Sequence, residues 1–285
     1  MHKKTGCIDV HGATYAYTTY GRGEALVCLH GFTGSRKTWE PFLSIFGKSF
    51  QVITIDLPGH SETKGANERT METFCRDLAQ LLTKLEVKKA HVLGYSFGGR
   101  VALSFANIAP ERVQTLVLES ASPGLQTEKE RTERRQHDEQ LARKLETNGV
   151  EKFVDFWENI ALFESQKSLA KNVRDVIRRE RLSQTEKGLA ASLRHMGTGV
   201  QPSWWDTLEQ IDVPVALITG ELDPKFVNIN DAMKKRLPYA THFVVKNAGH
   251  AVHVEQVKKF AKIVMTFVKQ NRKEGAINDS SMGKS

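Results

Sequence analysis

The pentapeptide at residues 94–98, Gly-Tyr-Ser-Phe-Gly, constrains the fold of this chain more than any other feature. A short apolar, β-prone run precedes it at residues 91–93, and residues 99–106 after it have a helical pattern that ends before Pro110. A serine on such a strand-to-helix turn is strained and exposes its hydroxyl. The glycines let the turn close, and N–H groups at the helix start can stabilise an oxyanion. The pattern predicts a nucleophilic Ser96, with a glycine-rich helix N-cap as the simpler alternative.

Strand-like and helix-like segments alternate on both sides of this turn. Strands are predicted over residues 13–20, 25–29, 51–55, 91–93, 115–118, 215–219 and 241–245. Helices are predicted over residues 39–46, 70–85, 99–106 and 254–268. Several strands are continuous apolar runs, as expected when both faces of a strand are buried. The order predicts an α/β fold with a mostly parallel central sheet flanked by helices.

Residues 124–205 interrupt this alternation, because they contain no strand-like run and only charged, amphipathic helical sequence. We therefore predict one α/β core, formed by residues 1–123 and 206–285, into which a helical cap at residues 124–205 is inserted. The polar stretch from Gln270 to Ser285 is expected to be frayed.

Composition excludes several classes of protein. The chain has 285 residues and a net charge of +8, but the cations between Arg131 and Lys144 alternate with acids and no nucleic-acid-binding motif accompanies them. We expect no nucleic-acid partner.

No apolar run approaches the roughly 18 residues of a membrane span, and no signal-like segment opens the chain, so we expect no membrane insertion and a cytoplasmic location. Cys7, Cys28 and Cys75 form no CxxC pair and are expected to be buried thiols in a reducing compartment.

A catalytic serine needs a base, and the base needs an acid that orients it. Asp223 follows the predicted strand at residues 215–219, and His250 follows the strand at residues 241–245. The carboxyl ends of parallel strands are where ligands gather in such sheets. Asp223 could instead only initiate a turn, and His250 could only be a residue at a helix N-terminus. The order Ser96, Asp223, His250 is that of the α/β-hydrolases and favours a catalytic triad.

The loop after the strand at residues 25–29 is expected to complete an oxyanion hole. The backbone N–H groups of Phe32 and Phe97 are the predicted donors. We interpret His30 and His60, at neighbouring strand ends, as structural, and His253 as a surface or packing residue. His250 and His253 are close in sequence, but His250 belongs to the predicted triad and no further ligand cluster joins the two, so no metal is predicted. No cofactor is predicted either.

With these motifs the chain resembles the α/β-hydrolase-fold proteins over essentially its whole length. Within them it is most similar to the family of 2-succinyl-6-hydroxy-2,4-cyclohexadiene-1-carboxylate synthases of menaquinone biosynthesis. The resemblance is carried by residues 29–35, 56–60, 94–100 and 122–126. Two parts of this resemblance are more specific than the rest. They are Arg100, which follows the strand-to-helix turn at Ser96, and the Pro-Gly-Leu-Gln sequence at residues 123–126. Ser61 departs from the pattern, because many relatives have glycine there, and we expect only a local effect.

The resemblance implies a lyase that eliminates pyruvate from 2-succinyl-5-enolpyruvyl-6-hydroxy-3-cyclohexene-1-carboxylate. This substrate is a small tricarboxylate, and arginine is the residue best suited to bind carboxylates. The local match assigns substrate contacts to Tyr95, Arg100, Arg134, Trp157 and Arg181. A small shift of register would select Arg131 or Arg135, and Arg178 or Arg179, in place of the two cap arginines, which could also belong to a solvated helix face.

In the implied mechanism His250, oriented by Asp223, draws the proton from Ser96. The Ser96 oxygen then removes the proton α to the succinyl carbonyl, and the N–H groups of Phe32 and Phe97 stabilise the enolate oxygen. Pyruvate leaves and a conjugated diene remains. Serine is a base in this reaction, and no acyl-enzyme forms.

Three alternatives use the same fold. A carboxylesterase or C–C bond hydrolase would use the triad as a nucleophile, but an apolar cap would suit it better than one rich in arginine. A non-enzymatic ligand receptor does not need an intact triad. A haloalkane dehalogenase would have aspartate where Ser96 stands. The sequence leaves the oligomeric state open between a monomer and a weak homo-oligomer.

Overall fold

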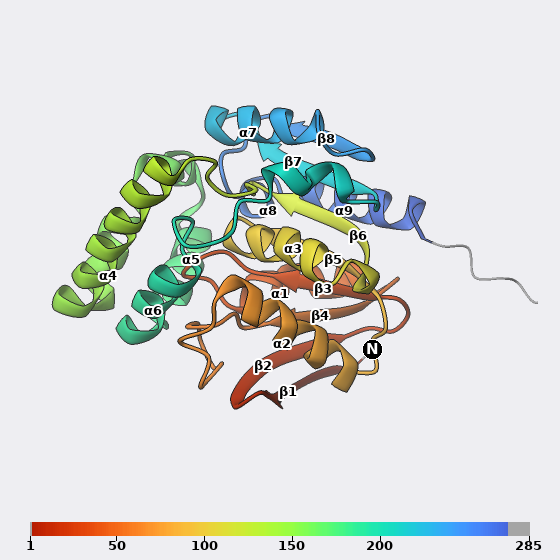
Figure 1. The fold of residues 1–285 in the computed structure, drawn as a ribbon, viewed down its shortest axis with the longest axis horizontal. Helices are drawn as coiled ribbons and strands as arrows, with labels where there is room; N and C mark the ends of the chain where they lie inside the picture. Colours follow the sequence, from red (N-terminus) through yellow and green to blue (C-terminus); the bar gives the residue numbers. More distant parts are fainter. Residues whose placement is uncertain (1, 273–285) are drawn as a thin grey trace, which may run out of the picture.

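A computed structural model describes residues 2–272, so most of the predicted frayed tail, from residue 273 onward, lies outside the described residues. Within them, one eight-stranded sheet forms the centre of the molecule, and its strand order is β1-β2-β4-β3-β5-β6-β7-β8 (Figure 1). The strands are β1 (Lys3–Val10), β2 (Ala13–Tyr20), β3 (Ala25–Leu29), β4 (Gln51–Ile55), β5 (Ala90–Tyr95), β6 (Val113–Glu119), β7 (Val215–Gly220) and β8 (Ala240–Val245). β1 and β2 are antiparallel to their neighbours, and the other strands are parallel. The predicted α/β fold with a mostly parallel sheet is confirmed.

Helices cover both faces of this sheet. The core helices are α1 (Glu40–Phe46), α2 (Met71–Lys84), α3 (Phe97–Ile108), α7 (Pro224–Lys234), α8 (Val252–Glu255) and α9 (Val257–Gln270). Short 3-10 turns lie at η1 (Arg36–Trp39), η2 (Pro110–Arg112) and η4 (Trp205–Gln210).

The strands in the middle of the sheet are buried on both faces, which explains their continuous apolar sequence. All five residues of β3 are buried. Val27 and Leu29 belong to the hydrophobic core shared with α2 and α3, whereas Leu26 and Cys28 belong to the core shared with α1 and α9. With both faces covered, polar residues gather at the carboxyl ends of the strands.

Residues 124–205 fold into helices that lie together at the side toward which β6 points (Figure 1). These helices are α4 (Glu128–Trp157), η3 (Ala161–Ser168), α5 (Lys171–Leu182) and α6 (Glu186–Met196). α4 and α6 pack around a small hydrophobic core of their own that includes Leu141, Phe153 and Leu189. Phe32 of the sheet side packs against this core, so the helices are joined to the loop after β3.

Three elements differ from the sequence-based expectation. β1 was not predicted, because it is an exposed edge strand whose sequence is polar, and a turn at His11 and Gly12, both with positive φ, joins it to β2. α7 was also not predicted. The predicted closing helix over residues 254–268 is broken at Gln256, whose φ of −135° separates α8 from α9.

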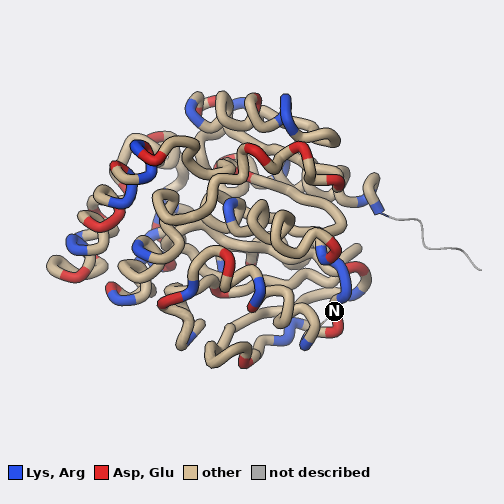
Figure 2. The backbone as a smooth tube through the Cα atoms, viewed as in Figure 1, with Lys and Arg blue, Asp and Glu red and all other residues tan. Residues whose placement is uncertain are grey.

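Charge is dispersed over the long helix α4, where basic and acidic residues alternate (Figure 2). Several of its arginines pair with carboxylates on the same helix, as Arg135 does with Glu128 at 2.5 Å and Arg143 with Glu139 at 2.8 Å. None of the helices within residues 2–272 is both long and apolar enough to cross a membrane.

Candidate active site

Ser96 lies on the sharp turn between β5 and α3, as the pentapeptide predicts. Its backbone has a φ of 49° and a ψ of −105°, a conformation that costs energy for a residue with a Cβ atom. Two backbone hydrogen bonds hold it there: its N–H donates to the Glu119 carbonyl at 2.8 Å, and its carbonyl accepts from the N–H of Arg100 at 3.0 Å. A Cβ atom on Gly94 would lie 2.2 Å from the backbone oxygen of Gly98, so this turn needs glycine there.

Ser96, His250 and Asp223 form one hydrogen-bonded chain. The His250 Nε2 atom lies 3.0 Å from Ser96 Oγ, and its Nδ1 atom lies 2.7 Å from Asp223 Oδ2. The other Asp223 oxygen accepts the N–H of Phe226 and caps α7, so Asp223 is both a turn residue and a partner of His250. His250 and Asp223 are 1% and 6% exposed. The geometry allows the imidazole to accept the serine proton.

The loop after β3 brings Phe32 to the same place. Gly34 donates its N–H to the Gly31 carbonyl at 3.0 Å, and the Thr33 backbone between them has a φ of 68°. Phe32 and Phe97 both line the cavity that contains Ser96. The predicted pair of oxyanion donors therefore borders the triad.

Two buried histidines hold this loop in place. His30 donates from Nδ1 to the Gly31 carbonyl at 2.8 Å and accepts the Leu57 N–H on Nε2 at 3.0 Å. His60 donates from Nδ1 to the Pro58 carbonyl and accepts the Thr33 N–H on Nε2 at 3.3 Å. Each ring therefore serves as one donor and one acceptor, which only a neutral imidazole can do.

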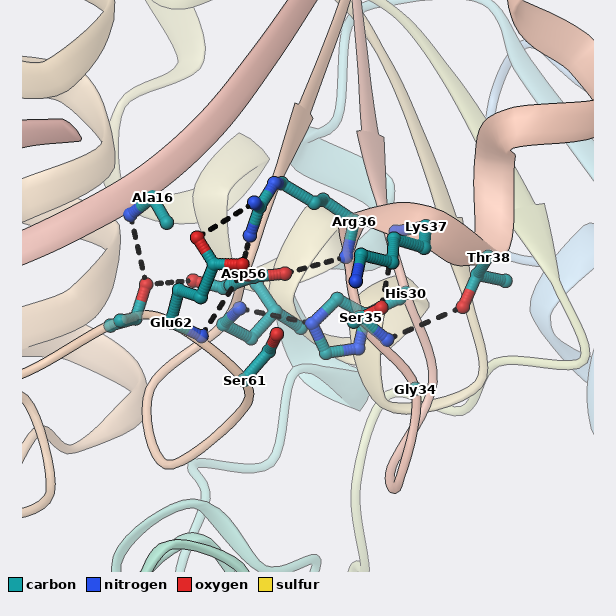
Figure 3. A network of polar contacts seen from close by, with 12 residues as sticks. Ala16, His30, Gly34, Ser35, Arg36, Lys37, Thr38, Asp56, Ser61 and Glu62 are labelled. Atoms are coloured by element: carbon teal, nitrogen blue, oxygen red, sulfur yellow. Dashed lines mark hydrogen bonds and ion pairs between the residues drawn. The ribbon is translucent and has the colours of Figure 1, made fainter. Parts of the chain in front are cut away.

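A network of charged residues locks the adjoining segments (Figure 3). The buried Asp56 accepts the backbone N–H of Arg36 at 2.6 Å and forms an ion pair with the Arg36 guanidinium, which also contacts Glu62 at 2.9 Å. Figure 3 shows His30 beside this network, at the base of the loop that runs to Thr38. His30 and Asp56 thus hold the two ends of the segment from residue 30 to residue 36, which carries Phe32.

Acidification is expected to destabilise this loop. Burial lowers the pKa of His30 to about 4 and, together with repulsion from His30, that of His60 to about 3. Because the unfolded histidines titrate near 6.5, the unfolded state binds more protons between these values, and stability falls as the pH drops below about 6.5. Each histidine should reduce the free energy of unfolding by about 2 kcal/mol between pH 7 and pH 5.

Urea unfolding at the two pH values measures this loss, and the NMR resonances of the two rings identify its source. The ring protons of His30 and His60 should show no titration between pH 7 and pH 5. A resonance of either ring that titrates near pH 6.5 would contradict the assignment.

One cavity of about 800 Å³ contains most of the predicted site. The predicted residues that line it are Phe32, Ser96, Phe97, Arg100, Arg134, Trp157, Asp223 and His250. Tyr95 and Arg181 are not among its lining residues. They line a second cavity of about 460 Å³, which shares Phe32 with the first and also contains His253. Eight of the ten predicted residues thus line the first cavity, and the other two line the adjoining second cavity.

Arg100 is the cation best placed to bind an anion in the first cavity. Its guanidinium donates to the Met196 carbonyl at 2.9 Å and to the side chain of Gln201, and it lies 5.1 Å from the centre of the Phe97 ring. In the part of the chain that the structure describes, no carboxylate forms an ion pair with it. Burial lowers the pKa of Arg100 to about 9, so the side chain remains positive at neutral pH. Arg134, by contrast, already pairs with Asp138 at 2.8 Å.

Trp157 closes the side of the cavity formed by residues 124–205. Its ring stacks on Phe153 with centroids 5.5 Å apart and meets the edge of Phe32 at 5.4 Å. The indole Nε1 atom is buried and has no hydrogen-bond partner among residues 2–272. A ligand oxygen is the kind of acceptor that would satisfy it.

Arg181 is favoured over its neighbours for ligand binding in the second cavity. Its guanidinium lies 4.7 Å from the centre of the Phe163 ring and donates to Gln166 at 3.3 Å, and burial lowers its pKa. The neighbouring Arg178 is already neutralised, since it pairs with Asp155 and Glu158 at 2.6 Å each. The substrate contact of Arg181 remains a prediction.

Seven polar residues of the first cavity had no role assigned from the sequence: Ser120, Ser122, Gln126, Glu130, Ser192, Thr198 and Lys225. For two of them a signal was present. Lys225 follows Asp223 and Pro224 directly, and Gln126 ends the Pro-Gly-Leu-Gln sequence at residues 123–126.

Comparisons with known proteins identify the fold and the family of this chain. A family model described as the alpha/beta hydrolase fold matches residues 24–257. A Bacillus subtilis (strain 168) protein, whose name marks it as a candidate 2-succinyl-6-hydroxy-2,4-cyclohexadiene-1-carboxylate synthase, is 48% identical over 90% of this chain and 95% of its own. The synthase of that name from Pectobacterium atrosepticum is 30% identical over 85% of this chain and 93% of its own.

Among solved structures, MenH from S. aureus superimposes with a TM-score of 0.87 and 35% sequence identity, covering 91% of this chain and 99% of that one. The match extends over nearly the whole of each chain, so the resemblance includes residues 124–205 as well as the sheet. This chain belongs to the alpha/beta hydrolase fold family and, within it, to the family of the 2-succinyl-6-hydroxy-2,4-cyclohexadiene-1-carboxylate synthases.

Proposed function

We propose that this protein is a lyase that eliminates pyruvate from 2-succinyl-5-enolpyruvyl-6-hydroxy-3-cyclohexene-1-carboxylate to give 2-succinyl-6-hydroxy-2,4-cyclohexadiene-1-carboxylate. The proposal rests on one observation: a single cavity contains both the Ser96–His250–Asp223 chain and the Arg100 guanidinium, which has no ion-pair partner among residues 2–272. Two relatives of this chain are named as 2-succinyl-6-hydroxy-2,4-cyclohexadiene-1-carboxylate synthases, and these names support the same pyruvate elimination.

Ser96 acts as the base in this proposal. His250 accepts the Ser96 proton, and the serine oxygen takes the proton from the carbon α to the succinyl carbonyl. The electrons of that C–H bond move through the ring as a new double bond forms, the bond to the enolpyruvyl oxygen breaks, and pyruvate leaves. The N–H groups of Phe32 and Phe97 stabilise the negative oxygen that develops meanwhile. The leaving group departs as the enolate of pyruvate, and this enolate takes up the proton that His250 releases, which gives pyruvate and restores the neutral imidazole.

The substrate has three carboxylates, which require several fixed cations. Arg100 provides one within the first cavity that forms no ion pair with the described residues, and Lys225 and Arg134 line the same space. Arg181 and Tyr95 border the adjoining cavity, where a further arm of the substrate could reach them. Arginine suits this task because its planar group binds a carboxylate through two hydrogen bonds.

Residues 124–205 are proposed to be the cap of this site, inserted between core segments 1–123 and 206–285. This segment supplies Arg134 and Trp157 to the wall opposite Ser96. It also holds the oxyanion loop, since Glu180 accepts hydrogen bonds from Ser35 at 2.6 Å and Thr38 at 2.9 Å. A cap attached to that loop couples substrate binding to the position of the Phe32 N–H.

We propose the cytoplasm as the place of the reaction. The support is that Cys7, Cys28 and Cys75 are all free thiols, the state that a reducing compartment maintains. Cys28 and Cys75 are buried as predicted, but the prediction was wrong for Cys7, which is exposed because it lies on the edge strand β1.

A comparison of two substrates tests the proposed function against esterase activity. Purified protein is assayed for pyruvate release from the tricarboxylate intermediate and for hydrolysis of p-nitrophenyl acetate. We expect the intermediate to be turned over with the higher kcat/KM. An ester turned over efficiently with no pyruvate release above the protein-free rate would favour the carboxylesterase alternative.

Replacing Arg100 by methionine should separate the two activities. Loss of a charged, hydrogen-bonded contact is expected to lower kcat/KM for the tricarboxylate by about 10- to 100-fold, mainly through KM. Hydrolysis of the uncharged ester should change less than about threefold, because it has no carboxylate to bind. Arg143→Met, on the exposed face of α4, is the matched control. Equal losses for both substrates in Arg100→Met would count against a carboxylate-binding role.

A further inference from the structure

A second buried pair of a histidine and a carboxylate lies beneath the triad. Glu119, the last residue of β6, is fully buried, and His253 of α8 is 3% exposed. Glu119 Oε1 accepts both the backbone N–H and the ring Nδ1–H of His253, each at 2.9 Å, and Oε2 lies 3.0 Å from the same Nδ1 atom. No other ion pair to Glu119 exists within residues 2–272.

Burying such a pair costs free energy, because both ionisable groups must be removed from water. Two ionisable groups removed from water gain little net stability, and an apolar pair of the same size is often more stable. A buried pair with this geometry therefore calls for a role other than stability.

The pair connects the nucleophile to the base. The Glu119 backbone carbonyl accepts the Ser96 N–H at 2.8 Å, while its side chain holds His253. From α8 the connection returns to His250, because Glu255 accepts the Gly249 N–H at 2.7 Å. The strand end that fixes Ser96 thus also fixes the loop that carries His250.

The ring of Tyr95 lies between the two histidines. Its centroid is 5.5 Å from that of His250 and 4.6 Å from that of His253. A displaced His253 would therefore leave both the tyrosine ring and the His250 loop without support on one side.

We propose that Glu119 and His253 are positioning residues that set the distance between His250 Nε2 and Ser96 Oγ. They touch neither the serine hydroxyl nor the imidazole of His250, and they act through α8 and the backbone of Ser96. The proposal extends the proposed function, but it concerns the Ser96–His250 geometry, which a reagent unrelated to that function also reports.

The test replaces His253 by alanine and by asparagine. Misplacement of a catalytic group by about 1 Å costs on the order of 100-fold, so His253→Ala should lower kcat for pyruvate release by about 10- to 100-fold and change KM by less than about threefold. The rate at which a small fluorophosphonate labels Ser96 should fall by a similar factor. This labelling does not use the proposed substrate, so it remains informative even if the proposed function is wrong.

His253→Asn provides the rescue. The asparagine amide places an N–H donor near the position of Nδ1, so it can donate to Glu119. We expect this variant to label within about fivefold of the wild-type rate. A rate as low as that of His253→Ala would contradict the proposed hydrogen bond.

His242→Ala is the matched control. The side chain of His242 on β8 is 3% exposed, against 4% for that of His253. It pairs with Asp231 at 2.7 Å but contacts no member of the triad. We expect it to lower Tm while leaving labelling within about twofold of wild type. The proposal is overturned if folded His253→Ala labels at the wild-type rate, or if the two alanine variants lose labelling in proportion to their loss of stability.

A second variant keeps the proposal testable if His253→Ala does not fold. Glu119→Leu preserves the approximate size of the side chain but removes both acceptor oxygens, so the two N–H groups of His253 lose their partner on β6. Labelling several-fold slower than wild type is the expected result, and an unchanged labelling rate in this variant would overturn the proposal.

Discussion

Ser96→Ala is expected to lower kcat for pyruvate release by on the order of 1,000- to 10,000-fold, because it removes the base that takes the substrate proton. The oxyanion donors and the arginines remain, so KM should change little and residual activity above the protein-free rate should persist. A coupled assay that reports pyruvate through NADH oxidation measures both constants. Tm should remain close to wild type. Alanine also carries a Cβ atom, so the substitution relieves only part of the backbone strain that the positive φ at residue 96 causes.

Ser168→Ala, an exposed serine on η3, is the control for this substitution. Near-normal pyruvate release by Ser96→Ala would show that another group is the base. Intact-mass measurement during turnover separates a base from a nucleophile. We expect unmodified wild-type protein, and an acyl adduct on Ser96 would assign it the nucleophilic role of an esterase.

Asp223→Asn is expected to lower kcat by on the order of 1,000-fold or more through the tautomer of His250. The asparagine oxygen can still accept the Phe226 N–H and cap α7, which turns its NH2 group toward His250 Nδ1. Nδ1 must then be the acceptor, so Nε2 carries the proton and cannot take one from Ser96. The effect should fall on kcat, because Asp223 is not expected to contact a carboxylate of the substrate. Pyruvate-release kinetics of the folded variant measure it.

Asp212→Asn tests whether any aspartate substitution near β7 has the same effect, since Asp212 is exposed and has no side-chain partner among the described residues. It should retain wild-type kinetics. A kcat for Asp223→Asn within about tenfold of wild type would mean that His250 needs no orienting carboxylate.

The central sheet was predictable because burial on both faces leaves a direct mark on the sequence. A strand such as β3 has no polar position, and its bounds coincide with the predicted residues 25–29. The edge strand β1 is different, since its exposed side chains include Lys3, Lys4 and Thr5. Its apolar residues, Cys7, Ile8 and Val10, are confined to one end and do not distinguish the strand from a loop. α7 was missed for a related reason, because only Asn230 and Met233 along it are buried.

The triad was predictable because chain order and strand ends both limit where partners can lie. Contacts between segments that are distant in the sequence could not be predicted in this way. Glu119 and His253 are 134 positions apart, so nothing in the sequence indicated that His253, interpreted as a surface or packing residue, would bind a buried carboxylate. The assignment of Tyr95 and Arg181 to an adjoining cavity depends on how α5 packs on the core, which a local sequence match does not contain.

Following pyruvate and the diene together tests the proposed elimination most directly. The intermediate is generated in situ, and the protein is added at several concentrations while pyruvate and the absorbance of the conjugated diene are followed. One pyruvate is expected for each diene, formed at a rate proportional to the protein concentration. Rates no higher than those without protein would contradict the proposed elimination.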